Sequence, residues 1–188
     1  MRYKAKMILD RFSRKAIHPV AGVPGGFIKP LLENEQEEFS AIMAQVLDFV
    51  LFALDYSKKE VFPQFQDQLP GLGTITTGFI GAVDKQGALN LYDGQIRLMK
   101  SDTSYIDFDP ADYKDYLGEK VVPFSYGKFP YAKTWNEGFS LNSNSPKGIY
   151  RSNTLARINV ADHISTPRAQ EELELFREKF GRPAQATL

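Results

Sequence analysis

The amino-acid sequence predicts an α+β fold, and three observations along the chain support this assignment. Residues 1–73 carry apolar side chains mainly at helical spacing. Residues 74–108 consist of short β-prone runs separated by turn signals, which is typical of a small antiparallel meander. Residues 109–188 combine a short helix, an irregular aromatic loop and a terminal helix. A chain of 188 residues is long enough for one domain, so we expect a single α+β segment over residues 1–188.

Two helices are expected in the helical part. The first would end near Arg14, and its apolar face would consist of Tyr3, Met7, Ile8 and Phe12. The second is the longest periodic segment, and Asn34 with Glu37 fits a capping box at its start. It should run to about Ser57. Its inward face would consist of Phe39, Ile42, Val46, Val50 and Leu54.

The remaining elements follow from β-prone runs and helix signals. The runs "TGFIGAV", "ALNLYD" and "QIRLMK" are separated by the turn-forming sequences "DKQG" and "DG". Asp109, which precedes a proline, predicts the cap of a short helix. Residues 123–150 are expected to form an ordered but irregular loop. The terminal helix should have Thr166 as its N-cap, Pro167 at its first position and Gly181 after its last turn.

Composition excludes several kinds of site and partner. The 23 basic and 23 acidic residues balance, so no global field attracts nucleic acid or an anionic membrane. The absence of cysteine excludes disulfides, thiolate metal sites and cysteine nucleophiles, and two histidines are too few for a site built mainly on histidine ligands. The N-terminus lacks the pattern of a secretory signal, and no run approaches the roughly 18 apolar residues of a membrane span. We therefore expect a cytoplasmic protein.

The stretch Ile17–Gly26, "IHPVAGVPGG", is the most unusual part of the sequence. It does not match a phosphate-binding loop, because Lys29 follows Phe and Ile and no hydroxyl residue comes after it. A turn that needs a positive φ at a glycine explains it better. His18 could act as an acid, a base or a ligand. It could equally be a structural hydrogen-bonding group, and both interpretations remain open from the residues alone.

Three other groups favour structural roles. His163 is expected to be a surface or capping residue. Asp107 and Asp109, with two further aspartates nearby, lack the central glycine and terminal glutamate of an EF-hand calcium loop. The aromatic residues between Phe124 and Trp135 have few basic neighbours, so they indicate core or interface packing better than stacking on bases or sugars. No catalytic residue and no metal ligand is predicted.

Three stretches taken together resemble the large, catalytic subunit of nickel–iron hydrogenases. They are "IHPVAGVPGGFIKPL", then "GALNLYDGQIRLM" leading to "VVPFSYGKFPYAK", and finally "GIYRSNTLARINVADHISTPRAQEELELFR". The similarity is strongest to the cytoplasmic branch whose members are linked to NAD, F420 or other soluble carriers. The order and spacing of the stretches match, and they cover nearly the whole chain. Where the family usually has Val-Gly-Pro, this chain has "SNT" at residues 152–154.

The resemblance implies a parent enzyme that reversibly oxidises hydrogen at a nickel–iron centre with carbonyl and cyanide ligands. Two Cys-x-x-Cys pairs hold that centre in the family. Because this chain has no cysteine, it resembles the central portion only and is expected to be inactive by itself. The implied partners are a small subunit carrying iron–sulfur clusters and diaphorase-type electron-carrier subunits. His18 matches a histidine that reaches the interface with the small subunit near its proximal iron–sulfur cluster.

Two alternatives accompany this interpretation. The chain could be a cysteine-free, non-catalytic subunit-interaction module derived from the same family, or an unrelated small-ligand binding domain. A central portion separated from the rest of its subunit would also expose apolar surface, so self-association is expected for the chain alone.

Overall fold

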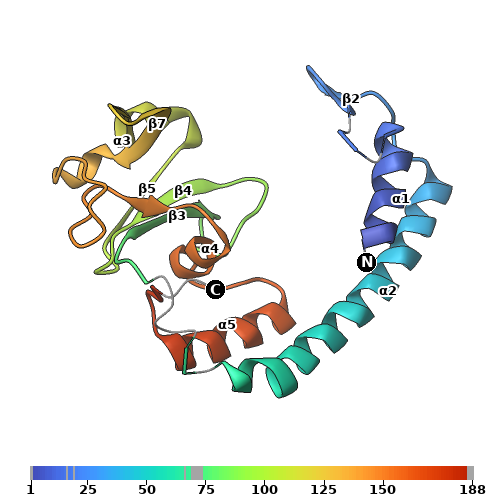
Figure 1. Cartoon of the computed structure of the whole chain (residues 1–188). Coiled ribbons are helices and arrows are strands. Elements are labelled where there is room, and N and C mark those ends of the chain that lie inside the picture. The colour runs from blue at the N-terminus through green and yellow to red at the C-terminus, as the bar shows by residue number, and fades with distance from the viewer. Residues whose placement is uncertain (1, 16, 19, 66, 69–73, 186–188) are drawn as a thin grey trace. The chain divides into compact units, whose positions relative to one another are not determined.

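A computed structural model describes residues 2–15, 17, 18, 20–65, 67, 68 and 74–185. These residues form helices and small sheets, which confirms the predicted α+β fold class. The chain divides into two compact units, Met1–Gln66 and Asp67–Leu188, and each is described by itself (Figure 1).

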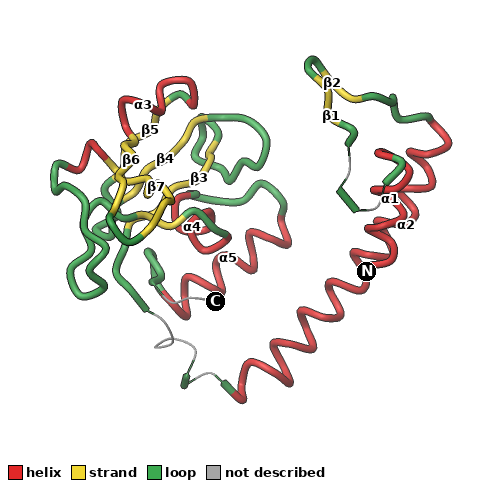
Figure 2. Tube along the Cα trace, turned by 45° about the horizontal axis from the view of Figure 1, so that its top comes forward, coloured by secondary structure: helices red, strands yellow, loops and turns green. Residues whose placement is uncertain are grey.

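The first unit is built on two antiparallel helices that lie side by side (Figure 2). Its elements are α1 (Arg2–Ser13), β1 (Gly22–Val23), β2 (Gly26–Phe27), α2 (Glu33–Tyr56), the π-helical η1 (Ser57–Val61) and the 3-10 helix η2 (Phe62–Gln64). The rings of Phe12 and Phe39 stack with their centroids 5.5 Å apart. Lys4, near the start of α1, donates a hydrogen bond to Gln45, farther along α2. These two contacts join α1 to the N-terminal and middle parts of α2.

The start of α2 differs from the expected capping box of Asn34 and Glu37. The N-cap is Leu32, and the Glu35 carboxylate accepts a hydrogen bond from its backbone N–H at 3.2 Å. Glu35 also forms an ion pair with Lys29 Nζ at 2.5 Å. The capping prediction is therefore wrong by two residues, because the carboxylate held by a lysine sets the first turn. The predicted extension to about Ser57 is confirmed.

The apolar surface of α2 is less buried than its periodicity suggested. Val50 is 38% exposed, so its predicted inward position is wrong. Phe39, Ile42, Val46 and Leu54 are half-buried. The segment Glu33–Gln64 is also long and apolar enough to cross a membrane by length and composition alone, which corrects the expectation that no segment approaches this length. A single helix of this kind near the N-terminus is weak evidence for a membrane span.

The second unit is organised around a four-stranded sheet (Figure 1). Its elements are β3 (Gly78–Val83), β4 (Gln95–Met99), β5 (Tyr105–Phe108), η4 (Pro110–Asp112), α3 (Tyr113–Tyr116), β6 (Leu117–Val122), β7 (Ser125–Ala132), η5 (Lys133–Trp135), β8 (Tyr150–Arg151), α4 (Thr154–Val160) and α5 (Pro167–Phe180). The sheet has the order β5-β4-β3-β8, in which β3, β4 and β5 are antiparallel neighbours and β8 runs parallel to β3. Strands β3, β4 and β5 form an antiparallel meander, in which β3 and β4 coincide with the predicted runs "TGFIGAV" and "QIRLMK", whereas β5 was not predicted.

Each face of the sheet carries its own core cluster. On one face, Phe79, Val83 and Met99 are fully buried beneath the α4 segment, where they contact Val160 and Ala161. On the other face, the cluster consists of Leu98, Phe108 and Ala132 with half-buried neighbours such as Ile80, Ile96 and Leu117. The alternation of side chains along β3 and β4 supplies residues to both clusters.

Three details of the second unit differ from the sequence-based expectations. The run "ALNLYD" is not a strand, because the Asn90 carboxamide oxygen accepts from the backbone N–H groups of Tyr92 and Asp93 and closes a turn. Part of the expected irregular loop is the antiparallel β6–β7 hairpin. Helix α4 was not predicted, and its N-cap is Asn153, whose side chain accepts from Ala156 N at 2.9 Å.

Two other helix signals behave as the sequence predicts. The Asp109 side chain accepts from Ala111 N at 2.8 Å at the start of η4, although the helical turns end before Leu117. Helix α5 begins at Pro167 and ends before Gly181, whose φ is 75°.

Candidate functional site

His18 lies in the loop that joins α1 to α2, and its side chain is exposed. Its φ is 53°, a left-handed backbone conformation that few non-glycine residues adopt. Pro19, the second residue of the His-Pro motif, lies outside the described residues. No hydrogen bond or ion pair of the His18 imidazole occurs within the part of the chain that the structure describes. The histidine is therefore presented to solvent, without a side-chain partner among the described residues.

Apolar side chains are exposed on both sides of His18. Ile17 is 66% and Phe27 71% exposed, and Val20 and Ile28 are also largely exposed. Strands β1 and β2 form a minimal hairpin, in which Gly25 has a φ of 89°. The positive φ of Gly25 agrees with the predicted glycine turn. Phe27 follows this turn, and its ring is exposed. We call residues 17–32 the His18 loop, and the exposed apolar side chains of this loop its apolar rim.

The His18 loop is fixed at its C-terminal end. Lys29 Nζ pairs with Glu35 at 2.5 Å and lies 3.4 Å from the Arg11 carbonyl oxygen at the end of α1. The hydrogen bond from Lys29, followed by that from Leu32 N, lowers the pKa of the Glu35 carboxyl. Lys29, which a phosphate-binding loop would aim at a ligand, is instead committed to the helix start.

Two of the aspartates considered as a calcium site, Asp107 and Asp109, have other partners. The Asp107 carboxylate accepts two hydrogen bonds from Arg97, and the Asp109 carboxylate caps η4. Within the described ranges, no group of three or more His, Cys, Asp or Glu side chains is arranged to hold a metal ion. The His163 side chain is exposed, and its backbone carbonyl accepts from Leu89 N at 2.9 Å.

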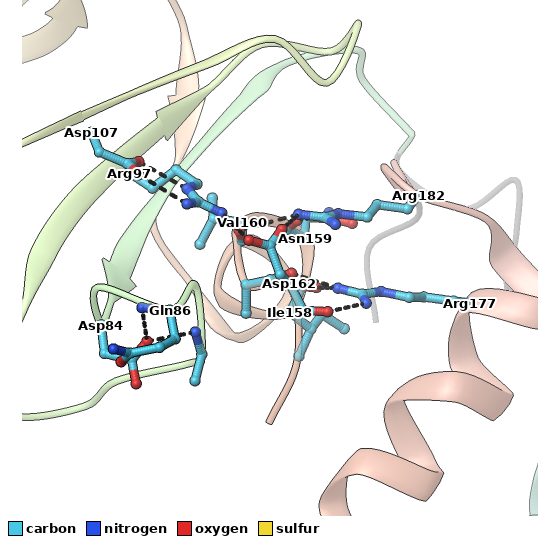
Figure 3. Close-up of polar contacts among 12 residues, drawn as sticks. Asp84, Gln86, Arg97, Asp107, Ile158, Asn159, Val160, Asp162, Arg177 and Arg182 are labelled. Carbon is cyan, nitrogen blue, oxygen red and sulfur yellow. Dashed lines mark hydrogen bonds and ion pairs between the residues drawn. The ribbon is translucent and has the colours of Figure 1, made fainter. Parts of the chain in front are cut away.

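A buried arginine that the sequence did not reveal is the centre of the polar structure in the second unit (Figure 3). Arg97 on β4 is 4% exposed. Its guanidinium makes two hydrogen bonds of 2.8 Å to the Asp107 carboxylate, which lies opposite it on β5. It also donates to Asp162 at 2.8 Å and to the Val160 carbonyl oxygen at 3.1 Å. The Tyr105 ring lies 3.9 Å from the guanidinium carbon, a cation–π contact.

Two further arginines converge on the turn that follows α4 (Figure 3). Arg182 donates to the Asp162 carboxylate at 3.0 Å and to the Asn159 carbonyl oxygen at 2.9 Å. Arg177 on α5 donates to the carbonyl oxygens of Ala161 at 2.6 Å and Asp162 at 2.8 Å. Arginine side chains therefore donate hydrogen bonds to the carbonyl groups at the C-terminus of α4, where the helix dipole favours a cation.

The charges of this cluster reinforce one another. Burial alone would raise the pKa of the Asp162 carboxyl, but hydrogen bonds from Arg97 and then Arg182 outweigh burial and lower it. The hydrogen bonds from Arg97 to Asp107, opposed by burial, raise the pKa of Arg97. Asp162 is therefore ionised and Arg97 charged at neutral pH, and the cluster has the character of a structural clamp between the sheet and α5.

Comparisons with known proteins show what the chain is similar to. No protein-family model matches it. It is 38% identical over its full length to a subunit of the F420-non-reducing hydrogenase vhu of Methanococcus voltae, of which the match covers 43%. It is 33% identical over 92% of its length to an iron-sulfur subunit of the F420-non-reducing hydrogenase of Archaeoglobus profundus, covering 36% of that protein. The chain is related to hydrogenase subunits. It spans about two fifths of the length of the curated relatives it matches.

A more distant relative and a solved structure agree with this relationship. The chain is 31% identical over 86% of its length to the beta subunit of the NAD-reducing hydrogenase HoxS of Cupriavidus necator, covering 33% of it. It also matches a chain in the crystal structure of an NAD+-reducing [NiFe]-hydrogenase in the H2-reduced state, with a TM-score of 0.82 and 27% identity. That match covers 98% of this chain and 40% of the other.

The names of these curated relatives correct two expectations from the sequence, namely the type of subunit and its metal cofactor. One curated relative is named as an iron-sulfur subunit and another as a beta subunit, which overturns the expected identity as a large, catalytic nickel–iron subunit. The expected nickel–iron centre with carbonyl and cyanide ligands is corrected on the same ground, because the metal cofactor named for a curated relative is iron–sulfur. The hydrogenase relationship, inferred from three sequence stretches, is confirmed at this coarser level.

Proposed function

We propose that this chain is a docking portion of a hydrogenase subunit, and that it attaches its subunit to an iron–sulfur partner in a multi-subunit complex. The complex oxidises hydrogen reversibly and passes electrons through iron–sulfur clusters to a soluble carrier such as NAD. The relatives named as hydrogenase subunits support the activity of the complex. Because NAD, which the HoxS relative is named for reducing, is a soluble carrier, the proposal includes a cytoplasmic complex.

The donor groups of this chain do not fit an iron–sulfur cluster. Clusters are held by cysteine thiolates, with histidine replacing some of them in one class. The sequence has no cysteine and two histidines, and the side chains of the described residues form no metal-binding group. The clusters of the complex therefore take their ligands from polypeptide other than these 188 residues. We therefore propose that this chain positions its subunit against the iron–sulfur partner. This role corresponds to the cysteine-free, non-catalytic interaction module that the sequence left open as an alternative.

The exposed apolar rim around His18 is the observation that carries the proposal. Apolar side chains gathered on a surface mark an interaction site more often than a solvated loop. The C-terminal end of the loop is fixed by Lys29 and Glu35, which reduces the conformational entropy that the loop loses on binding. An imidazole in the middle of such a rim can donate a hydrogen bond to a sulfur or carbonyl acceptor of the partner. We therefore assign His18 to the interface with the iron–sulfur partner, close to its nearest cluster.

The proposal is tested by co-purification from the organism that makes the protein. A tagged chain should retain a protein that contains iron and acid-labile sulfur, and His18→Ala should reduce that retention by roughly tenfold if one interfacial hydrogen bond is lost. His163→Ala is the matched control, because this second histidine is exposed in the other unit. Equal retention by wild type and His18→Ala would contradict the interface assignment, and retention of no iron–sulfur protein by the wild type would contradict the proposed function.

As part of the same proposal, we expect the chain to self-associate when its partner is absent. The first unit exposes large apolar side chains on α2 as well as on the His18 loop, among them Met43, Leu47, Phe49 and Phe52. An apolar surface of this kind associates with another copy when its own partner is absent. Sedimentation of the purified chain over a range of concentrations should show dimers or larger species.

A further inference from the structure

The second unit carries an open groove on the side of β3 where β8 ends. Its volume is about 470 Å³. The floor is apolar and includes Ile80, Ile96 and Phe108, while Asn90, Ser152 and Arg157 contribute polar groups. Arg157 is the single charged residue among those that line the groove. A groove with this lining favours an occupant that combines an apolar group with a negative charge.

Arg157 differs from the other arginines of the second unit. Each of those has a protein partner through its guanidinium: Arg97, Arg151, Arg168, Arg177 and Arg182. Within the described residues, the guanidinium of Arg157 makes no hydrogen bond or ion pair, and the residue is exposed. Its backbone is nevertheless rigidly held, because Arg157 N donates to Asn153 O at 3.0 Å and Ala161 N donates to Arg157 O at 3.1 Å.

The close approach of α4 to β3 places Arg157 at the groove. A Cβ atom on Gly81 would lie 2.7 Å from Val160 Cγ2, 3.5 Å from Arg157 Cα and 3.8 Å from Arg157 Cγ. Because glycine leaves this space open, the helix rests directly on the strand, and the arginine stem lies across it. The backbone and stem of Arg157 are thus placed at the edge of the groove before any occupant arrives, and such preorganisation lowers the entropic cost of binding.

We propose that this groove binds an extended polypeptide segment that sets a carboxylate side chain on Arg157 and a neighbouring apolar side chain on the floor of Ile80 and Ile96. A planar guanidinium matches a carboxylate through two parallel hydrogen bonds. Because the groove is more open than enclosed, it suits one face of a polypeptide chain better than a small molecule that must be surrounded. More than half of the length of the curated relatives lies outside the matched region, which supplies polypeptide that can reach this surface. The proposal does not depend on the His18 assignment.

The test uses the whole 188-residue chain and two blocked tripeptides, acetyl-Leu-Asp-Phe-amide and acetyl-Leu-Asn-Phe-amide. Titration is followed by the backbone amide signals of Gly81, Ala82 and Ser152 in two-dimensional NMR spectra. The Asp peptide should bind about tenfold more tightly than the Asn peptide, which has the same shape without the charge. Arg157→Gln should remove this difference. Arg168→Gln, a matched change of a surface arginine in the same unit, should preserve it.

Several outcomes would overturn the proposal. These are equal affinity for the two peptides, no saturable shift at the groove up to about 10 mM peptide, or loss of the discrimination in Arg168→Gln. Groove signals that move with protein concentration in the absence of peptide would identify a second copy of this chain as the occupant and would also overturn it. If Arg157→Gln fails to fold, the comparison of the two peptides on the wild-type chain still decides.

Discussion

Arg97 and Asp162 are 65 residues apart in sequence, and the guanidinium of the first donates a 2.8 Å hydrogen bond to the carboxylate of the second. This contact joins the middle of β4 to the turn that follows α4 (Figure 3). Asp162 also accepts from Arg182. A single carboxylate therefore connects the sheet to the C-terminal part of the unit, and the stability of this region depends on its charge.

Arg97→Ala should destabilise the second unit by about 2–4 kcal/mol. Breaking a buried pair leaves an uncompensated charge, but Asp107 and Asp162 are 24% and 42% exposed, so solvent reduces the full penalty. Denaturant midpoints followed by the near-ultraviolet signal of Trp135 report on this unit. Arg168→Ala, whose pair with Glu171 is exposed, should change the free energy of unfolding by less than about 0.5 kcal/mol. Equal changes in the free energy of unfolding for the two substitutions would contradict a stabilising role of Arg97 between Asp107 and Asp162.

The Asp162 carboxylate should make stability depend on pH in the acid range. Its pKa is lowered in the folded state, so its contribution is present above the unfolded value near 3.9 and is lost as the pH falls through the folded value. Wild type should be more stable than Asp162→Asn at neutral pH, and the difference should disappear once the pH lies below the pKa of Asp162 in the folded state. Unfolding midpoints of both proteins measured from neutral to acid pH give this difference directly. A constant difference at all pH values would show that the charge is not responsible.

Glu35→Gln should loosen the His18 loop without unfolding α2. The substitution removes the negative partner of Lys29 and weakens the acceptor for Leu32 N, so residues 17–32 should open more often. Limited proteolysis should cleave this loop faster in Glu35→Gln than in wild type. Glu37→Gln, at the position of the expected cap, is the control and should be cleaved at the wild-type rate. Because the pKa of Glu35 is lowered, acidification should speed cleavage of the wild type as the carboxyl becomes protonated.

Local signals predicted the elements whose ends are set by their own residues. Thr166, Pro167 and Gly181 bound α5 as expected, and Asp109 caps η4. The failures came from local side-chain hydrogen bonds that propensity does not reveal, such as those accepted by Glu35 and Asn90, or from mixed patterns. In β7, Phe129 and Tyr131 alternate with exposed residues at the strand period, but the intervening glycine and proline resembled loop chemistry.

The polar cluster could have been found in part from the sequence. Arg97 lies two residues before Met99 in a run of β-prone residues, so the strand period places a charge on the same face as a core side chain. A charge in such a position needs a buried partner. Its partner Asp162 follows a helix of seven residues that periodicity does not reveal. The groove beside Arg157 depends on the packing of that same helix, which no local pattern specifies.

Gly81→Ala tests the close contact between β3 and α4 on which the position of Arg157 depends. The added methyl group would overlap Val160, which is fully buried and cannot move without disturbing Phe79 and Met99. Overpacking of this kind costs roughly 1–3 kcal/mol. Ala82→Val is the control, because the next residue points to the open groove and should cost less than about 1 kcal/mol. Denaturant midpoints separate the two, and a Gly81→Ala protein as stable as wild type would mean that α4 does not rest directly on the strand.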